Sequence, residues 1–423
     1  MNLREVRRAR LGLAAIVLAV VWGCGTAAPG ATDPAGSARP ASSIAPTDDQ
    51  VADATTGPPG PTLSPTARPT PTPTPTLESA ALAAAPCLAA SSSGPFLATD
   101  PGSLTCLGQP LALTGFTFYP ALLGGSKAWH NPAFPTYIDK VLDMGAAAGQ
   151  NLIRPTDQFD SHATGQKADD PVVWANMDYL MTAAQRRGVF VVVDLSAFRW
   201  LLMSQGKDPA NANSWIPFID MVAARYKDSP AVAFYSIAGE PTPPATAAQL
   251  RTLLDFYRTT SGELRKVDPN HLISVGGFNH MEDHSELGWW QSIDALPTND
   301  IVAVKTYSQH DLDLMPAIST YGRSVGKPVI DEEFGMPQSY GDGSFSGGAA
   351  YNGLATGRAA FFESVYRSGN TLGFAGFIFW NMGCQLGSGS YEVNPRTPAV
   401  WSVVVQNAAA PTVPPPTGSS LCP

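Results

Sequence analysis

The sequence of 423 residues is short of positive charge. It contains 26 Lys and Arg residues against 35 Asp and Glu residues, which gives a net charge of −9. Outside an N-terminal cluster the basic residues are scattered and form no stripe, so nucleic acid is excluded as the expected partner. The chain also lacks a phosphate-binding loop, a serine nucleophile elbow and the His-Glu-x-x-His order of zinc proteases. We therefore expect neither a metal nor a cofactor.

An apolar run near the N-terminus, Leu11 to Trp22, is too short for a membrane span. It follows four arginines and has the length of a signal-peptide core. The run ends just before Cys24, in a sequence that resembles a bacterial lipobox. We expect residues 1–24 to be a signal peptide whose Cys24 is lipidated, so that the protein is exported and meets a membrane only through this anchor. Plain secretion after cleavage nearby is the alternative.

Cysteine is scarce, with five residues in the whole chain. With Cys24 set aside, an even number remains, which in an exported chain indicates disulfides. Three pairings are open. We favour Cys87–Cys106, which closes a short loop, and Cys384–Cys422, which fixes the C-terminal end of the chain. Free buried thiols are the alternative.

Two segments have a composition that cannot bury a core. Residues 25–84 are rich in Pro, Thr and Ala, with a Pro-Thr repeat at 69–76, and residues 411–423 form a second Pro-rich stretch. Such sequence predicts a disordered linker and a tail. Residues 85–410 between them are expected to form one folded domain, and we expect a monomer.

Within this domain, short apolar runs alternate with amphipathic stretches, which is typical of repeated βα units. We count eight strands, and the alternation predicts an α/β fold of the (β/α)8 barrel type. An open doubly wound sheet needs a glycine-rich turn after its first strand, and residues 114–119 supply none. The predicted strands cover residues 111–118, 151–154, 189–194, 231–237, 272–277, 301–305, 328–331 and 374–380, and the helices 137–148, 178–187, 215–225, 247–267, 316–325 and 349–367.

The active site of such a barrel lies where the strands end at their C-terminal face. Glu240 follows the fourth run, and Glu333 lies at the end of the seventh. Two carboxylates on different strands can flank a glycosidic bond, one as a proton donor and the other as a nucleophile.

The segment Lys327 to Gly335 resembles the seventh-strand signature of clan A glycoside hydrolases, in particular family 5 cellulases and β-mannanases. The resemblance implies that residues 85–410 are a catalytic domain, with Glu333 as nucleophile and Glu240 as acid/base. It also implies that Arg154 hydrogen-bonds the nucleophile and that Trp380 lies under the sugar. The expected reaction is cleavage of a β-linked polysaccharide, β-mannan or β-glucan, with retention of configuration.

Two positions depart from the family pattern. Gly239 stands where the family has an Asn that binds the sugar 2-hydroxyl, and Lys305-Thr306-Tyr307 replaces His-x-Tyr. Tyr307 can still hydrogen-bond the nucleophile, and Lys305 can lower its pKa through its charge. These departures indicate a divergent subfamily.

Glu332 lies beside the expected nucleophile. Side chains alternate along a strand, so only one of the two adjacent glutamates is expected to point into the barrel mouth. Alternation pairs Asp331 with Glu333 and leaves Glu332 facing the other way.

Further residues are weaker candidates for contacts with sugar, because ordinary packing accounts for each equally well. They are Asn279, His280, Trp200 and Trp129. Two alternatives to hydrolysis stay open. The first is a surface barrel that binds carbohydrate without cleaving it, and the second is a transglycosylase that uses the same acids.

Overall fold

The computed structural model describes residues 86–89, 94–120, 123–159, 170–208, 210–279, 288–412 and 422. The expected signal peptide with Cys24, the linker at 25–84, His280 and residues 413–421 of the tail lie outside these ranges. Among the residues described, no helix is both long and apolar enough to cross a bilayer.

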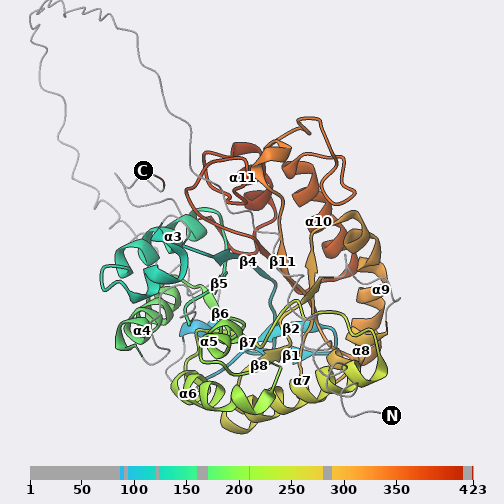
Figure 1. The fold of residues 1–423 in the computed structure, drawn as a ribbon. Coiled ribbons are helices and arrows are strands. Elements are labelled where there is room, and N and C mark those ends of the chain that lie inside the picture. The colour runs from blue at the N-terminus through green and yellow to red at the C-terminus, as the bar shows by residue number, and fades with distance from the viewer. Residues whose placement is uncertain are drawn as a thin grey trace, which may run out of the picture. The chain divides into compact units, whose positions relative to one another are not determined.

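A parallel sheet forms the centre of the structure, with helices around it (Figure 1). Its strand order is β8-β7-β6-β5-β4-β12-β11-β10-β9. The two end strands are halves of one interrupted strand, because β8 pairs with β7 whereas β9 pairs with β10. The sheet therefore closes around Gly276 and Gly277, and the predicted (β/α)8 barrel is confirmed. The strands are β4 Leu113–Phe118, β5 Leu152–Pro155, β6 Phe190–Asp194, β7 Val232–Ser236, β8 Leu272–Ser274, β9 Phe278–Asn279, β10 Val302–Thr306, β11 Val329–Phe334 and β12 Gly376–Phe379.

Six longer helices correspond to the predicted ones: α3 Pro135–Ala147, α4 Pro171–Arg186, α6 Ile216–Tyr226, α7 Ala247–Val267, α9 Gln309–Val325 and α10 Arg358–Leu372. Helix α9 starts seven residues earlier than expected, because the Ser308 side chain accepts the Asp311 N–H and caps it. Pro316 lies inside this helix. Three short helices had no clear periodicity in the sequence: α5 Phe198–Ser204, α8 Trp289–Asp294 and α11 Pro398–Gln406.

Glycines let three helices approach the barrel closely. A Cβ at Gly369 in α10 would lie 2.5 Å from the Phe377 ring of β12. A Cβ at Gly145 in α3 would meet the Phe116 ring of β4 at the same distance. Gly322 of α9 has a similar contact with β11. A hydrogen atom at these positions gives the strand side chains the space to pack against the helix backbone.

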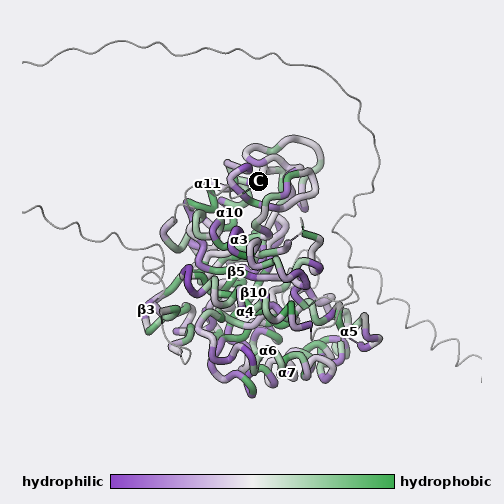
Figure 2. Tube along the Cα trace, turned by 90° about the vertical axis from the view of Figure 1, so that its left-hand side faces the viewer, coloured by the Kyte–Doolittle hydropathy of each residue, from purple (hydrophilic) through white to green (hydrophobic). Residues whose placement is uncertain are grey.

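A three-stranded antiparallel sheet, the N-terminal hairpin, closes the N-terminal end of the barrel. It consists of β1 Ala98–Asp100, β2 Ser103–Cys106 and β3 Gln109–Pro110. Its Gly102 N–H donates to the carbonyl of Gly326, where α9 ends. Figure 2 shows β3 and α5 at opposite sides of the barrel. The structure joins Cys87, in the 3-10 helix η1 Pro86–Ala89, to Cys106 of β2.

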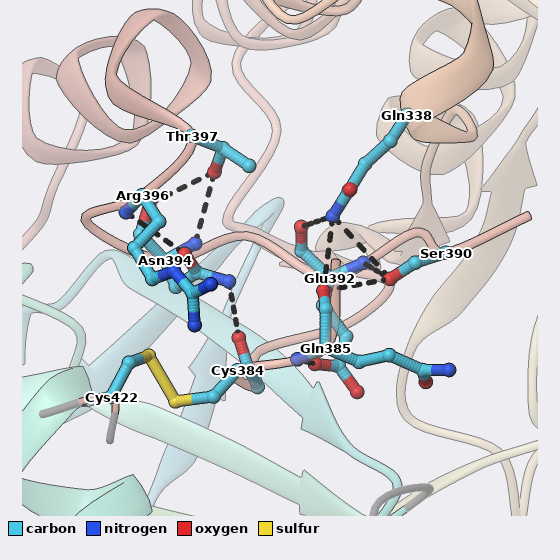
Figure 3. The surroundings of a disulfide bond; sticks show 10 residues. Gln338, Cys384, Gln385, Ser390, Glu392, Asn394, Arg396, Thr397 and Cys422 are labelled. Atoms are coloured by element: carbon cyan, nitrogen blue, oxygen red, sulfur yellow. Dashed lines mark hydrogen bonds between the residues drawn. A yellow bond between two sulfur atoms is a disulfide. The ribbon is translucent and has the colours of Figure 1, made fainter. Parts of the chain in front are cut away.

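The second disulfide joins Cys384 to Cys422, so both pairings are those favoured from the sequence. Cys384 belongs to the loop that follows β12, and Cys422 fixes the end of the chain to it (Figure 3). The Gln338 side chain donates to the Glu392 carbonyl at 3.0 Å, and Asn394 donates to the Gly383 carbonyl at 2.6 Å. These bonds and the disulfide hold the loop in place behind the C-terminal end of the barrel.

The glycine contacts predict that a Gly→Ala substitution has opposite effects on the free energy of unfolding in α10 and in α7. Gly369→Ala is expected to lower the free energy of unfolding by about 1–3 kcal/mol, because its methyl group overlaps the Phe377 ring. Gly262→Ala in α7 is the matched control, since a Cβ there meets nothing within 4 Å. It should raise the free energy of unfolding by about 0.5–1 kcal/mol through helix propensity. Chemical denaturation measures both, and equal effects would contradict the packing argument.

Candidate active site

Six polar side chains converge where the barrel strands end. Arg154 comes from β5, Asp194 from β6, Lys305 from β10 and Glu333 from β11. Glu240 follows β7, and Tyr307 follows β10. Because parallel strands end at one face of the barrel, residues far apart in sequence come into contact there.

Glu333 is surrounded by hydrogen-bond donors. Its Oε2 accepts from Arg154 at 2.5 Å and from Lys305 Nζ at 2.9 Å, and its Oε1 accepts from the Tyr307 hydroxyl at 2.7 Å. Burial opposes ionisation of this carboxyl, but the charges of Lys305 and Arg154 outweigh it and lower the Glu333 pKa to about 2. Glu333 is therefore a carboxylate whose orientation is fixed from three sides.

Arg154 connects Glu333 to a second acid. One of its terminal nitrogens binds Glu333, and the other lies 2.7 Å from Asp194 Oδ2. Burial alone would lower the Arg154 pKa, but the neighbouring carboxylates raise it above its ordinary value. Asp194 in turn accepts the N–H of Ser196 at 2.8 Å. Asp194 ends a predicted strand, and that position was the available sequence signal for it.

Glu240 is the most exposed of these acids, with 46% of its side-chain surface accessible. Its φ of 53° lies in the left-handed region, which residues with a side chain seldom adopt. The Glu240 N–H donates to the Gly277 carbonyl at 3.0 Å and holds this conformation. The turn directs the Glu240 carboxylate toward Lys305.

Lys305 lies between the two glutamates. Its Nζ is 2.9 Å from Glu333 Oε2 and 3.7 Å from Glu240 Oε2. Two contacts through one nitrogen limit the separation of these oxygens to at most about 6.6 Å. The two carboxylates are therefore close enough to lie on either side of one glycosidic bond.

The expectation that Glu332 faces away from the barrel is wrong. Glu332 is fully buried, and its carboxylate accepts from the hydroxyls of Ser236 on β7 and Ser274 on β8. The pairing of β10 with β11 shifts register, so that Val304 pairs with Asp331 but Lys305 pairs with Glu333. This irregularity breaks strict alternation and lets both glutamates point inward.

The space around Lys305 depends on glycines. A Cβ at Gly239 would lie 2.2 Å from the Gly276 carbonyl oxygen and 3.0 Å from Lys305 Cε. A Cβ at Gly277 would lie 3.1 Å from Lys305 Cγ. The Asn that the family pattern places at 239 therefore has no room here. The Lys305 side chain fills that space instead.

The structure brings only part of the expected aromatic set to the site. Trp380 is half-buried, and its ring stacks on Tyr119, with centroids 6.0 Å apart. Tyr119 was not predicted. Trp129 is fully buried between Phe118 and Phe134, so it offers no face to a sugar.

Three other candidates have no described side chain. Trp200 lies in α5, and Asn279 in β9 pairs with Lys305 through the backbone, but neither side chain is described. His280 lies outside the described residues. All three stay predictions.

Comparison with known families bears on this arrangement of acids. Residues 108–352 match the model described as Cellulase (glycosyl hydrolase family 5), which is more than half of the chain. The chain belongs to glycosyl hydrolase family 5. The matched span of this family 5 protein contains Arg154, Glu240, Lys305 and Glu333, and it ends before Trp380.

Two curated relatives come from Aspergillus terreus. The chain is 23% identical over 266 residues to the probable mannan endo-1,4-beta-mannosidase A-1, across 55% of this chain and 63% of the relative. It is 26% identical over 303 residues to the probable mannan endo-1,4-beta-mannosidase C, across 55% and 73%. The family 5 chain therefore spans less than two thirds of the first relative.

Solved structures share the fold at lower identity. The endo-1,4-beta-mannanase from Rhizomucor miehei matches with a TM-score of 0.57 and 16% identity, over 74% of this chain and 98% of that chain. The hyperthermostable endo-1,4-beta-D-mannanase from Thermotoga petrophila RKU-1 matches with a TM-score of 0.53 and 16% identity, over 70% and 99%. Both have the same barrel architecture.

We expect the same Glu→Gln substitution to affect turnover differently at Glu333 and at Glu332. If Glu333 is the nucleophile expected from the sequence, Glu333→Gln should lower turnover by several orders of magnitude, because the amide cannot attack carbon. Glu332→Gln should keep turnover of the same order as the wild type. A loss of activity in the Glu332 variant equal to that in the Glu333 variant would contradict the assignment. Turnover of an aryl β-glycoside measures both.

Stability of the Glu332 variant gives a second test. Burial raises the Glu332 pKa above its ordinary value of 4.5, so the folded state resists losing this proton more than the unfolded state does. The wild type therefore loses stability as the pH rises past 4.5, and Glu332→Gln does not. The melting temperature of the variant relative to wild type should rise between about pH 4 and about pH 7.

The charge of Lys305 predicts a shift on the acidic side of the pH profile. The nucleophile expected from the sequence, Glu333, would have to be ionised to attack, and its pKa of about 2 keeps it so in acid. Lys305→Met removes one of the two cations that lower this pKa while Arg154 stays. The acidic limb of kcat/KM should therefore move to higher pH. Tyr307→Phe is a control that removes a neutral donor, and it should move the limb less.

Proposed function

We propose that this family 5 protein is a retaining glycoside hydrolase, with Glu333 as nucleophile and Glu240 as acid/base. The observation that carries the proposal is the pair of facing carboxylates with different surroundings. Glu333 is buried and fixed by Arg154, Lys305 and Tyr307, whereas Glu240 is half-exposed. A nucleophile needs a fixed, ionised oxygen, and an acid/base needs access to the leaving group and to water.

The separation of the acids supports double displacement. Retaining enzymes place the two carboxyl groups about 5 to 5.5 Å apart, and inverting enzymes about 6.5 to 9.5 Å apart. The Oε2 atoms of Glu240 and Glu333 lie at most about 6.6 Å apart, so their separation extends no further than the lower edge of the inverting range. Direct attack by Glu333 is the favoured first step.

In that step a Glu333 oxygen bonds to the anomeric carbon while the carbon–oxygen bond to the leaving group breaks. Protonated Glu240 gives its proton to the departing oxygen, and a glycosyl ester of Glu333 forms. In the second step the Glu240 carboxylate takes a proton from water, whose oxygen attacks the same carbon. The ester bond breaks, and Glu333 returns as a carboxylate with Arg154 and Lys305 beside it.

β-1,4-Mannan is the substrate we propose to test first. The two Aspergillus terreus relatives are named as probable mannan endo-1,4-beta-mannosidases, and two solved neighbours are mannanases. β-Glucan and xylan complete the panel. Binding of a polysaccharide without release of sugar by the wild type would favour the carbohydrate-capture alternative.

Azide rescue separates the roles of the two acids. Glu333→Ala should lose hydrolysis and regain turnover with azide, which attacks a β-glycoside from the vacated side and gives the α-azide. Glu240→Ala should form the glycosyl enzyme from an activated aryl glycoside and stall. Azide should then release the β-azide from it. NMR of the anomeric proton reads the configuration, and the opposite pair of products would reverse the assignment.

A further inference from the structure

The family 5 reaction involves a sugar whose C2 hydroxyl lies one carbon away from the atom under attack. Hydrogen bonds to this hydroxyl that strengthen in the transition state contribute much of the rate of glycosidases. Any group that makes such a bond must lie beside the nucleophile and keep a free donor. Three donors lie beside Glu333: Arg154, Tyr307 and Lys305.

Two of these donors are already committed. The terminal nitrogens of Arg154 bind Glu333 and Asp194, and its side chain is 3% exposed. Tyr307 has one hydroxyl proton, which it donates to Glu333 Oε1 at 2.7 Å. Tyr307 therefore has no proton left for the substrate without giving up its bond to Glu333. Arg154 has further N–H protons, but both of its terminal nitrogens are held between Glu333 and Asp194, away from Glu240.

Lys305 differs in its position, because its ammonium group, which has three protons, lies between Glu333 and Glu240. Among the described residues it donates one hydrogen bond, to Glu333 Oε2 at 2.9 Å. Glu240 Oε2 at 3.7 Å is too distant for a hydrogen bond. Lys305 therefore presents donors to the gap between the two acids, where the anomeric carbon and its neighbour C2 must lie.

The glycines explain why a lysine reaches this gap. The Lys305 stem passes over Gly277 and Gly239, and a Cβ at either position would crowd it. The Gly276 carbonyl closes position 239 to every side chain. Position 239 therefore supplies no polar side chain on this side of the site, and the Lys305 ammonium from β10 lies there instead.

We propose that Lys305 is a specificity-determining residue that donates a hydrogen bond to the C2 hydroxyl of the sugar attacked by Glu333. The inference rests on the proposed function. As the Glu333 oxygen bonds to carbon, its negative charge disappears, and the ammonium loses its main partner. The bond from Lys305 to the hydroxyl then strengthens, so the contact contributes more to the transition state than to the bound substrate.

The test compares an aryl β-mannoside or β-glucoside with the aryl 2-deoxy-β-arabino-hexoside. One deoxy compound serves for both parents, because mannose and glucose differ only at C2. The measured quantity is the ratio of kcat/KM for the parent to kcat/KM for the deoxy compound. The intrinsic reactivity of the two glycosides cancels when this ratio is compared between wild type and variant.

Lys305→Met keeps the length of the stem and removes the donor. The wild-type ratio should exceed the variant ratio by about 10- to 100-fold, the effect of a hydrogen bond from a charged group. Tyr307→Phe is the matched control, since it removes a donor whose one proton is already given to Glu333. It should lower kcat/KM for both glycosides and keep the wild-type ratio.

Lys305→Gln covers the case in which the Met variant does not fold, because its neutral amide keeps a donor near C2. Its ratio should lie between those of the wild type and Lys305→Met, and below the wild-type ratio in any case. Equal ratios in an active wild type and in the Lys305 variants would overturn the inference and leave the proposed function standing. A wild type that cleaves neither glycoside would overturn both.

Discussion

The arrangement of side chains at the C-terminal face of the barrel depends on one electrostatic interaction, in which a buried carboxylate is held between two cations. Glu333 has Arg154 on one side and Lys305 on the other, and Asp194 and Glu240 balance the remaining charge of those cations. A buried charge is stable only when it is paired and hydrogen-bonded, so each member needs the others. The positions of four strand ends are therefore linked through these charges, and a change at one of them disturbs the orientation of Glu333.

The interrupted strand is the second element on which this arrangement rests. Gly276 and Gly277 separate β8 from β9, and the backbone of Gly239 passes close to Gly276. This contact excludes a side chain before Glu240 and leaves a path for Lys305. The chain departs from the family pattern at two positions, with a glycine at 239 and a lysine at 305. Both departures therefore belong to one structural change.

The sequence predicted what depends on residue type and order. Eight apolar runs indicated the barrel, and the ends of these runs held Glu240, Glu333 and Arg154. It did not predict the inward turn of Glu332, because a register shift between strands leaves no mark in residue types. Trp129 suits a sugar platform and a core equally well, and only its neighbours decide. The strands of the N-terminal hairpin have two to four residues, too few to show a period.

The N-terminal antiparallel sheet has a mechanical consequence for the barrel. The described chain begins at Pro86, and the disulfide from Cys87 to Cys106 fixes that point to the hairpin at the closed end of the barrel. Glu240 and Glu333 lie at the other end. A force applied at Cys87 is therefore taken up by β2 and not by the strand ends that carry the two acids.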